Sequence, residues 1–115
     1  MSEADKILDY DSLSHILQDD ANLIKMILES FFNDTQKQID ILEHALNNND
    51  VETAQKQAHK IKGSTANVRA IAMNQITIDM DLAGKAGEID GIINRMADLK
   101  EAFAIMKEHS QQYLD

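Results

Sequence analysis

Apolar residues recur every three or four positions along most of the chain, which is the spacing of one face of an α-helix. The clearest run extends from Ala21 to Leu46, and Asp19 or Asp20 can cap its first turn through a carboxylate oxygen. Its apolar face consists of Leu23, Ile24, Ile27, Leu28, Phe31, Phe32, Ile39, Leu42 and Leu46. The pattern therefore predicts one long amphipathic helix.

A shorter pattern of the same kind precedes this helix. We predict a short helix from Ser12 to Gln18, with Asp9 and Asp11 as possible caps. The apolar residues that share one face of it are Leu13, Ile16 and Leu17.

The second half of the chain predicts three more helices. The first begins at Val51, where the Asp50 carboxylate can accept from the free amides of the first turn. The next covers residues 71–86 and ends at Gly87, a residue suited to the left-handed position after a helix. Asp90 can cap the last helix, which continues nearly to the C-terminus.

Length and composition agree with an all-α interpretation. The 115 residues are 43% hydrophobic, which is enough for one core, and they include no proline and only four glycines. Short connections between long amphipathic helices favour antiparallel neighbours. We therefore predict a single domain over residues 1–115, an up-down antiparallel four-helix bundle with a short additional N-terminal helix.

Charge and missing motifs exclude several function classes. The net charge of −9 opposes binding to nucleic acid or to anionic membrane surfaces. The absence of cysteine removes disulfides and thiolate chemistry, and no glycine-rich nucleotide motif is present. With no signal peptide or transmembrane segment, we expect a cytoplasmic monomer that binds no cofactor and no metal itself.

Candidate chemistry centres on His59 in the third predicted helix. Its side chain projects about 130° away from the centre of the buried stripe, so we expect it to be exposed. Gly63 and Ala66 follow on the same side, which leaves a flat strip of small residues beside the ring. Because glycine inside a helix costs about 1 kcal/mol relative to alanine, Gly63 indicates close approach by another backbone.

The same helix gathers positive charge in an otherwise acidic chain. Four of the eleven basic residues lie on it: Lys56, Lys60, Lys62 and Arg69. Lys62 can place its ammonium beside the His59 ring and favour an anion there. This platform suits an acidic partner, and the indicated chemistry is attack by a neutral ring nitrogen on an activated phosphoryl donor.

The segment His59-x-x-Lys62-Gly63-Ser64-Thr65-Ala66-Asn67 resembles the signature of histidine phosphotransfer (Hpt) domains of bacterial phosphorelays. The similarity extends to residues 7–11, to the turn before Val51 and to Met80-Asp81. The resemblance implies that His59 carries a phosphoryl group, that Lys62 stabilises it and that Gly63 gives a receiver domain room to approach. Arg69 departs from the family, which commonly has glycine there.

The resemblance also implies partners. These are response-regulator receiver domains, which supply Mg²⁺, and a sensor or hybrid histidine kinase. The predicted partner surface comprises Lys56, Lys60, Ala66, Arg69, Leu13, Ile16 and Leu17, with the last three on the first helix near the acceptor.

Two functions remain open at this point. The first is a phosphoryl carrier that relays the group between receiver aspartates through phospho-His59, without kinase or ATPase activity of its own. The second is a non-catalytic helical module that binds a receiver or another protein without phosphotransfer. The other histidines have no comparable surroundings, and we expect them to be solvated or at the rim: His15, His44 and His109.

Overall fold

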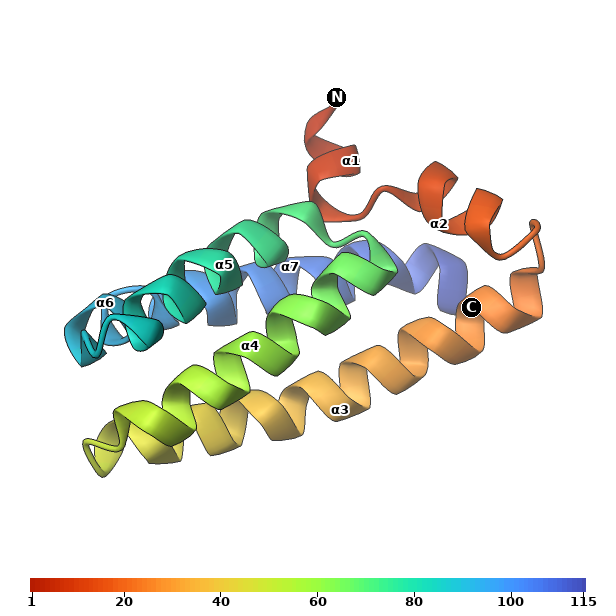
Figure 1. Cartoon of the computed structure of the whole chain (residues 1–115). Coiled ribbons are helices and arrows are strands. Elements are labelled where there is room, and N and C mark those ends of the chain that lie inside the picture. The colour runs from red at the N-terminus through yellow and green to blue at the C-terminus, as the bar shows by residue number, and fades with distance from the viewer.

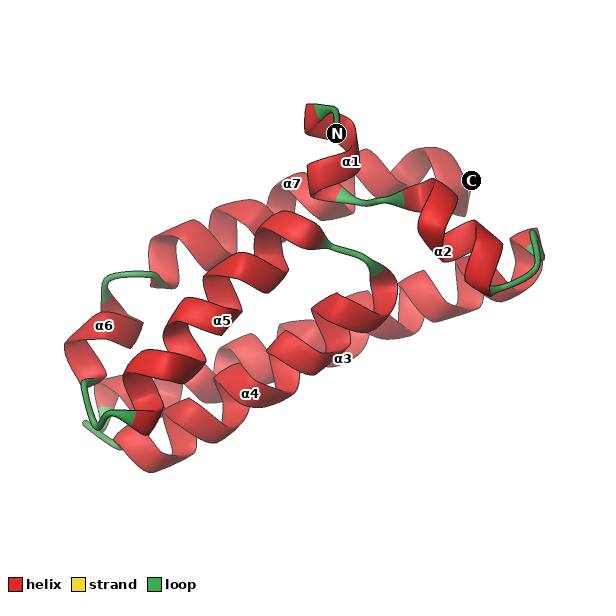
Figure 2. Ribbon diagram, turned by 45° about the horizontal axis from the view of Figure 1, so that its top comes forward, coloured by secondary structure: helices red, strands yellow, loops and turns green.

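The computed structural model describes residues 1–115 and contains only helices (Figure 1). They are α1 (Glu3–Ile7), α2 (Tyr10–Ile16), α3 (Ala21–Asn47), α4 (Val51–Val68), α5 (Ile71–Lys85), α6 (Ile89–Ile93) and α7 (Met96–Leu114). In the bundle, α4 packs between α3 and α5, and α7 closes the ring against α3 and α5 (Figures 1 and 2). The predicted all-α antiparallel four-helix bundle is confirmed.

The long helices begin at the caps that the sequence indicated. The Asp20 carboxylate accepts from the Leu23 amide at the start of α3, and the Asp50 carboxylate accepts from the Thr53 amide at the start of α4. The 27 residues of α3 extend about 40 Å, close to the 42 Å length of the molecule. This helix therefore supports the whole bundle from end to end.

The N-terminal region differs from the prediction of one helix over residues 12–18. It forms two short helices, because Ser2 and Asp5 build a capping box that starts α1 and the Asp9 carboxylate caps α2. The helix α2 ends before Gln18, since Gln18 and Asp19 both adopt the left-handed backbone conformation. Figure 1 shows α1 and α2 lying across one end of the bundle.

The prediction of one last helix capped by Asp90 was wrong. The helix is interrupted between α6 and α7. Glu88 is the N-cap residue of α6, and Asp90 lies inside the first turn of that helix. Because Ile92 and Met96 are both buried four positions apart, the apolar period continues across this break. Gly87 follows α5 with φ +74°, as predicted.

The core is aromatic where α3 meets α7. Phe103 of α7 lies between 6.0 and 6.5 Å from Phe32 and Phe31 of α3, measured between ring centroids. At one end of the bundle Tyr10 stacks on Tyr113 at 3.8 Å, which joins α2 to the end of α7. None of the helices combines the length and the apolar character needed to cross a membrane.

Candidate functional site

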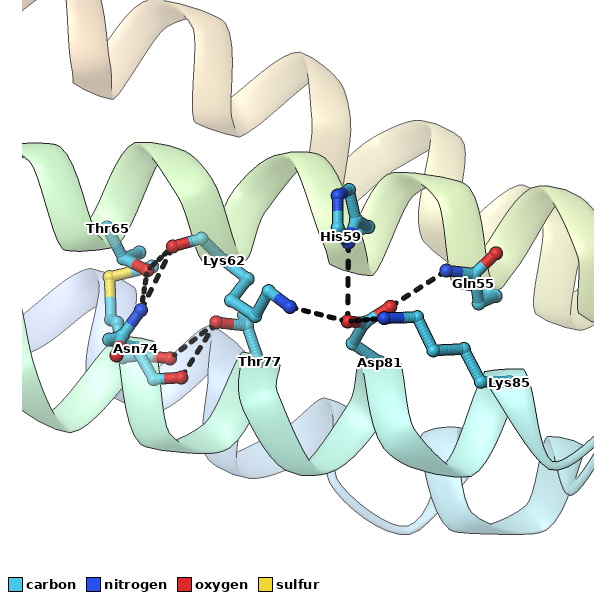
Figure 3. Close-up of polar contacts among 9 residues, drawn as sticks. Gln55, His59, Lys62, Thr65, Asn74, Thr77, Asp81 and Lys85 are labelled. Atoms are coloured by element: carbon cyan, nitrogen blue, oxygen red, sulfur yellow. Dashed lines mark hydrogen bonds and ion pairs between the residues drawn. The ribbon is translucent and has the colours of Figure 1, made fainter.

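His59 projects from the outer side of α4 toward solvent, beside the neighbouring helix α5. Its side chain is 56% exposed, which confirms the exposed position predicted from the helical period. The ring makes one polar contact, between its Nδ1 and the Oδ2 of Asp81 at 3.3 Å (Figure 3). The contact crosses from α4 to α5, so the position of the ring depends on how these two helices pack.

Asp81 is a buried carboxylate surrounded by donors. Only 1% of its side chain is exposed, and its Oδ2 receives Lys62 Nζ at 2.7 Å and Lys85 Nζ at 3.0 Å in addition to His59. The other oxygen, Oδ1, accepts from Gln55 Nε2 at 2.8 Å. Burial raises the pKa of Asp81, but these four donors outweigh it and hold the pKa well below its usual range. Asp81 is therefore ionised at neutral pH.

The ionised carboxylate determines which nitrogen of His59 carries the proton. A carboxylate without a proton can only accept, so the neutral ring must donate from Nδ1. The lone pair is then on Nε2, which no group of the chain binds and which points away from Asp81 in Figure 3. When the ring is neutral, the outward-facing Nε2 is therefore its nucleophilic nitrogen.

The contact between α4 and α5, which we call the α4–α5 seam, is close at this point. It contains Gln55, His59, Lys62 and Thr65 of α4 and Asn74, Asp81, Gly84 and Lys85 of α5. Asn74 Nδ2 donates to the Lys62 carbonyl oxygen at 2.9 Å and to Thr65 Oγ1 at 3.1 Å (Figure 3). A Cβ atom at Gly84 would lie 2.5 Å from Gln55 Cβ, so only glycine allows this separation of the helices.

The surroundings of Gly63 within this chain are open. A Cβ atom there would meet nothing within 4 Å, so no backbone of this chain approaches it closely. Gly63 and Ala66 are both exposed and continue the surface beside His59 as a strip of small residues. The close approach between helices is at Gly84 instead, and Gly63 leaves open space next to the histidine.

Some of the cations on α4 form ion pairs within the chain, and one does not. The sequence predicted the Lys62 ammonium beside the imidazole, and in the structure it pairs with Asp81 Oδ2, the oxygen that also contacts the ring. Lys56 pairs with Glu52 one turn earlier at 3.1 Å. Lys60 is exposed and has no ion-pair partner, so it remains available to another molecule.

Arg69 connects α4 to the N-terminal segment. It ends α4 with φ +67°, a left-handed conformation that favours glycine. Its carbonyl oxygen accepts from the Asp9 amide at 2.9 Å, and its Nε donates to Ser12 Oγ at 3.3 Å. The guanidinium predicted as part of a partner surface is therefore half-buried against α2.

The apolar residues of α2 divide into two groups. Leu13 is 2% exposed and belongs to the core, so its prediction as a partner contact was wrong. The reason is that α2 packs on α3 with this face inward. Ile16 is half exposed, and with Leu17 and Leu23 it lines a shallow pocket at the turn into α3.

Sequence reasoning gave no role to three residues that contact or adjoin His59. Asp81, Gln55 and Lys85 form the polar surroundings of the ring, and the exposed Leu82 follows Asp81 on α5. A signal was present, because Asp81 continues the four-residue spacing of Met73 and Thr77 on the buried face of α5. A buried aspartate on a helix requires donors from a neighbouring helix.

Comparison with known proteins places this geometry in a family. A model of the Hpt domain matches residues 26–109, which include the whole α4–α5 seam. The chain belongs to the Hpt domain family. It is thus a histidine phosphotransfer module, and Hpt proteins interact with response regulators and kinases in phosphorelays.

A solved Hpt protein shares the fold. The crystal structure of histidine-containing phosphotransfer protein B (HptB) from Pseudomonas aeruginosa PAO1 superposes with a TM-score of 0.85. The alignment covers 93% of this Hpt chain and 94% of that chain, at 20% sequence identity. No curated protein sequence matches this one. The shared architecture extends over nearly the full length of both chains.

Proposed function

We propose that this Hpt protein relays a phosphoryl group between the aspartates of receiver domains, with phospho-His59 as the intermediate. The observation that carries the proposal is the state of the ring: Nδ1 is bound to the ionised Asp81, and Nε2 is free and faces solvent. A phosphoryl acceptor needs an accessible lone pair of this kind.

In the proposed step, Nε2 attacks the phosphorus of a receiver's aspartyl phosphate. The N–P bond forms while the P–O bond to the aspartate breaks, and the aspartate carboxylate leaves with the bonding electrons. The ring retains the Nδ1 proton and gains positive charge, which lies against the Asp81 carboxylate. Transfer to a second receiver follows the same path in reverse.

Lys62 is the first cation available to the phosphoryl oxygens in this proposal. Its ammonium lies on the same carboxylate oxygen as the His59 ring, so it is the cation of α4 nearest to the ring that would carry the phosphoryl group. The receiver contributes the activated phosphoryl group and its Mg²⁺. Because charge neutralisation and positioning are the main requirements of phosphoryl transfer, the Hpt protein needs no nucleotide site.

The proposed docking surface surrounds the exposed ring. Gly63 and Ala66 provide flat access, Lys60 offers a free cation, and Leu82 adds an exposed apolar contact from α5. Ile16, exposed at the end of α2, stays in the proposed surface as predicted from the sequence. We retain two further predictions from the sequence, a monomeric state and a cytoplasmic location.

The test is transfer from a phosphorylated receiver. Receiver domains from the same genome, charged with radioactive acetyl phosphate, are incubated with the wild type, with His59→Gln and with His44→Gln. His44 is the matched control because it is an exposed helical histidine whose ring contacts only Asn48 one turn away. We expect acid-labile, alkali-stable label on the wild type and on His44→Gln, and none on His59→Gln.

Equal labelling of His59→Gln would contradict the proposal. Binding of a receiver to the wild type without any label would favour the alternative function, a module that binds receivers without phosphotransfer. The two outcomes are separated by measuring receiver binding and label in the same samples.

A further inference from the structure

We propose that Lys85 is a second cation for the phosphoryl group on His59, acting from α5 while Lys62 acts from α4. This inference rests on the proposed function and concerns the same site. Lys85 Nζ lies 3.0 Å from Asp81 Oδ2, the oxygen that also holds Lys62 Nζ and His59 Nδ1. Two ammonium groups from two helices therefore meet beside one imidazole (Figure 3).

The charges at this point do not balance in the unphosphorylated protein. One carboxylate faces two lysines, which leaves an excess positive charge in a chain whose net charge is −9. Asp81 does not require both lysines, since Lys62 occupies Oδ2 and Gln55 occupies Oδ1. The buried carboxylate therefore has its hydrogen-bond partners even without the second ammonium.

Lys85 is also the more exposed of the two cations. Its side chain is 51% exposed, against 29% for Lys62. It can leave Asp81 without leaving that carboxylate unpaired, because Gln55 stays on Oδ1 and the His59 ring stays on Oδ2. Asp81 thus keeps the Lys85 ammonium next to the ring until an anion arrives there.

A phosphoryl group on Nε2 supplies that anion. It carries a charge of about −1.5 to −2, whereas Asp81 carries −1 and already has other donors. The ammonium of Lys85 is therefore drawn toward the phosphoryl oxygens, and with Lys62 it neutralises the dianion from two sides. The bonds formed and broken in the transfer stay those of the proposed reaction.

The simpler interpretation is that Lys85 only stabilises its own helix. Asp81 and Lys85 are four positions apart on α5, a spacing at which ion pairs contribute a little to helix stability. That role concerns the unphosphorylated protein alone. It makes no difference to how a phosphoryl group on His59 ionises, and this property separates the two interpretations.

The experiment is a ³¹P NMR titration of the phosphorylated protein. Phosphoramidate serves as donor, and the wild type is compared with Lys85→Met, Lys85→Arg and the control Lys37→Met. Lys37 is an exposed lysine of α3 without an ion pair, lining the groove between α3 and α7. We expect Lys85→Met to raise the midpoint between phosphoryl monoanion and dianion by about half a pH unit. Lys85→Arg and Lys37→Met should titrate like the wild type.

Lys85→Met with an unchanged midpoint would overturn the role of Lys85, while label transfer from receivers to His59 would still stand. Failure of the wild type to accept a phosphoryl group from either receivers or phosphoramidate would overturn the proposed function, and this inference with it. Thermal unfolding of each variant checks the fold, and Lys85→Gln provides a second substitution if the methionine variant is unstable.

Discussion

The α4–α5 seam and the contact between α3 and α7 close the same bundle with opposite chemistry. Between α3 and α7, Phe103 packs edge to face with Phe31 and tilted against Phe32, and burial of apolar area is their contribution. Between α4 and α5, a buried carboxylate is surrounded by cations, an amide and a histidine. The comparison separates the part of the bundle that supplies stability from the part that positions a reactive group.

Joining two helices through buried charged groups, as at the α4–α5 seam, costs desolvation free energy. Removing Asp81 from water costs free energy that its hydrogen bonds only offset, and an apolar residue of similar size would often serve stability as well. The aromatic contact on the other side of the bundle shows that this chain can pack helices without buried charge. The charge at Asp81 is therefore best explained by the histidine that it holds.

The largest effect on stability is expected from the aromatic contact. Phe103→Ala removes a buried ring between α3 and α7, and it should lower the free energy of unfolding by about 3–5 kcal/mol. Phosphotransfer by the molecules that remain folded should be unchanged, because His59 and Asp81 lie on other helices. Urea unfolding and transfer rates per folded molecule measure the two quantities. A large loss of transfer per folded molecule would show that the two regions are not separate.

At the α4–α5 seam we expect a large effect on phosphotransfer and a smaller effect on stability. Asp81→Asn keeps the shape but removes the charge that fixes the proton on Nδ1 and gathers both lysines. We expect transfer to His59 to slow by about 10- to 100-fold, by analogy with the loss of a carboxylate that orients a metal-binding histidine. Stability should fall less than in Phe103→Ala. Single-turnover transfer from a receiver is the measurement, and a wild-type rate would contradict the role of Asp81.

Two glycines near His59 test how closely α4 and α5 pack, because one lies at the contact between the helices and the other faces open space. Gly84→Ala forces a methyl group against Gln55 and should destabilise the protein by about 1–3 kcal/mol. Gly63→Ala is the matched control, because it enters open space and removes a helix-interior glycine. It should raise stability by up to about 1 kcal/mol. Thermal and urea unfolding compare the pair, and equal changes would contradict the close approach of α4 and α5 at Gly84.

The smallest expected effect is a dependence of the free energy of unfolding on pH. The pKa of Asp81 is lowered by folding, so its ionised form stabilises the native state above the pKa of the unfolded chain, about 3.9. This contribution is lost as the pH falls from there through the folded pKa. The difference in unfolding free energy between wild type and Asp81→Asn should therefore be constant near pH 7 and shrink below about pH 4. A difference that grows in acid would contradict the ionised carboxylate.

The sequence predicted most of the bundle and the exposed position of His59, for identifiable reasons. Local spacing determines which residues share a helix face, so α3, α4 and the exposure of His59 followed from the pattern. The break between α6 and α7 did not, because Ile92 and Met96 keep the apolar period across it. Leu13 was misassigned for a related reason, since a single amphipathic turn does not show which of its apolar residues face the core.

The partners of His59 depend on packing between helices, and the helical period of α4 alone does not contain that information. Asp81 is separated from His59 by a turn and most of α5, and no local pattern links them. Gly63 was predicted to allow close approach by another backbone; no helix of this chain approaches it, and the room it gives a receiver domain stays a prediction. A charged residue on a buried helix face was the one available signal.

The most direct test of the account is to locate the phosphoryl group on the protein. A sample labelled with ¹⁵N-histidine is phosphorylated with phosphoramidate, and ³¹P–¹⁵N correlation NMR identifies the modified nitrogen. The account predicts phosphorylation of His59 through Nε2, with Nδ1 still carrying its proton toward Asp81. A phosphoryl group on Nδ1 of His59, or on His15, His44 or His109 in preference to His59, would contradict it.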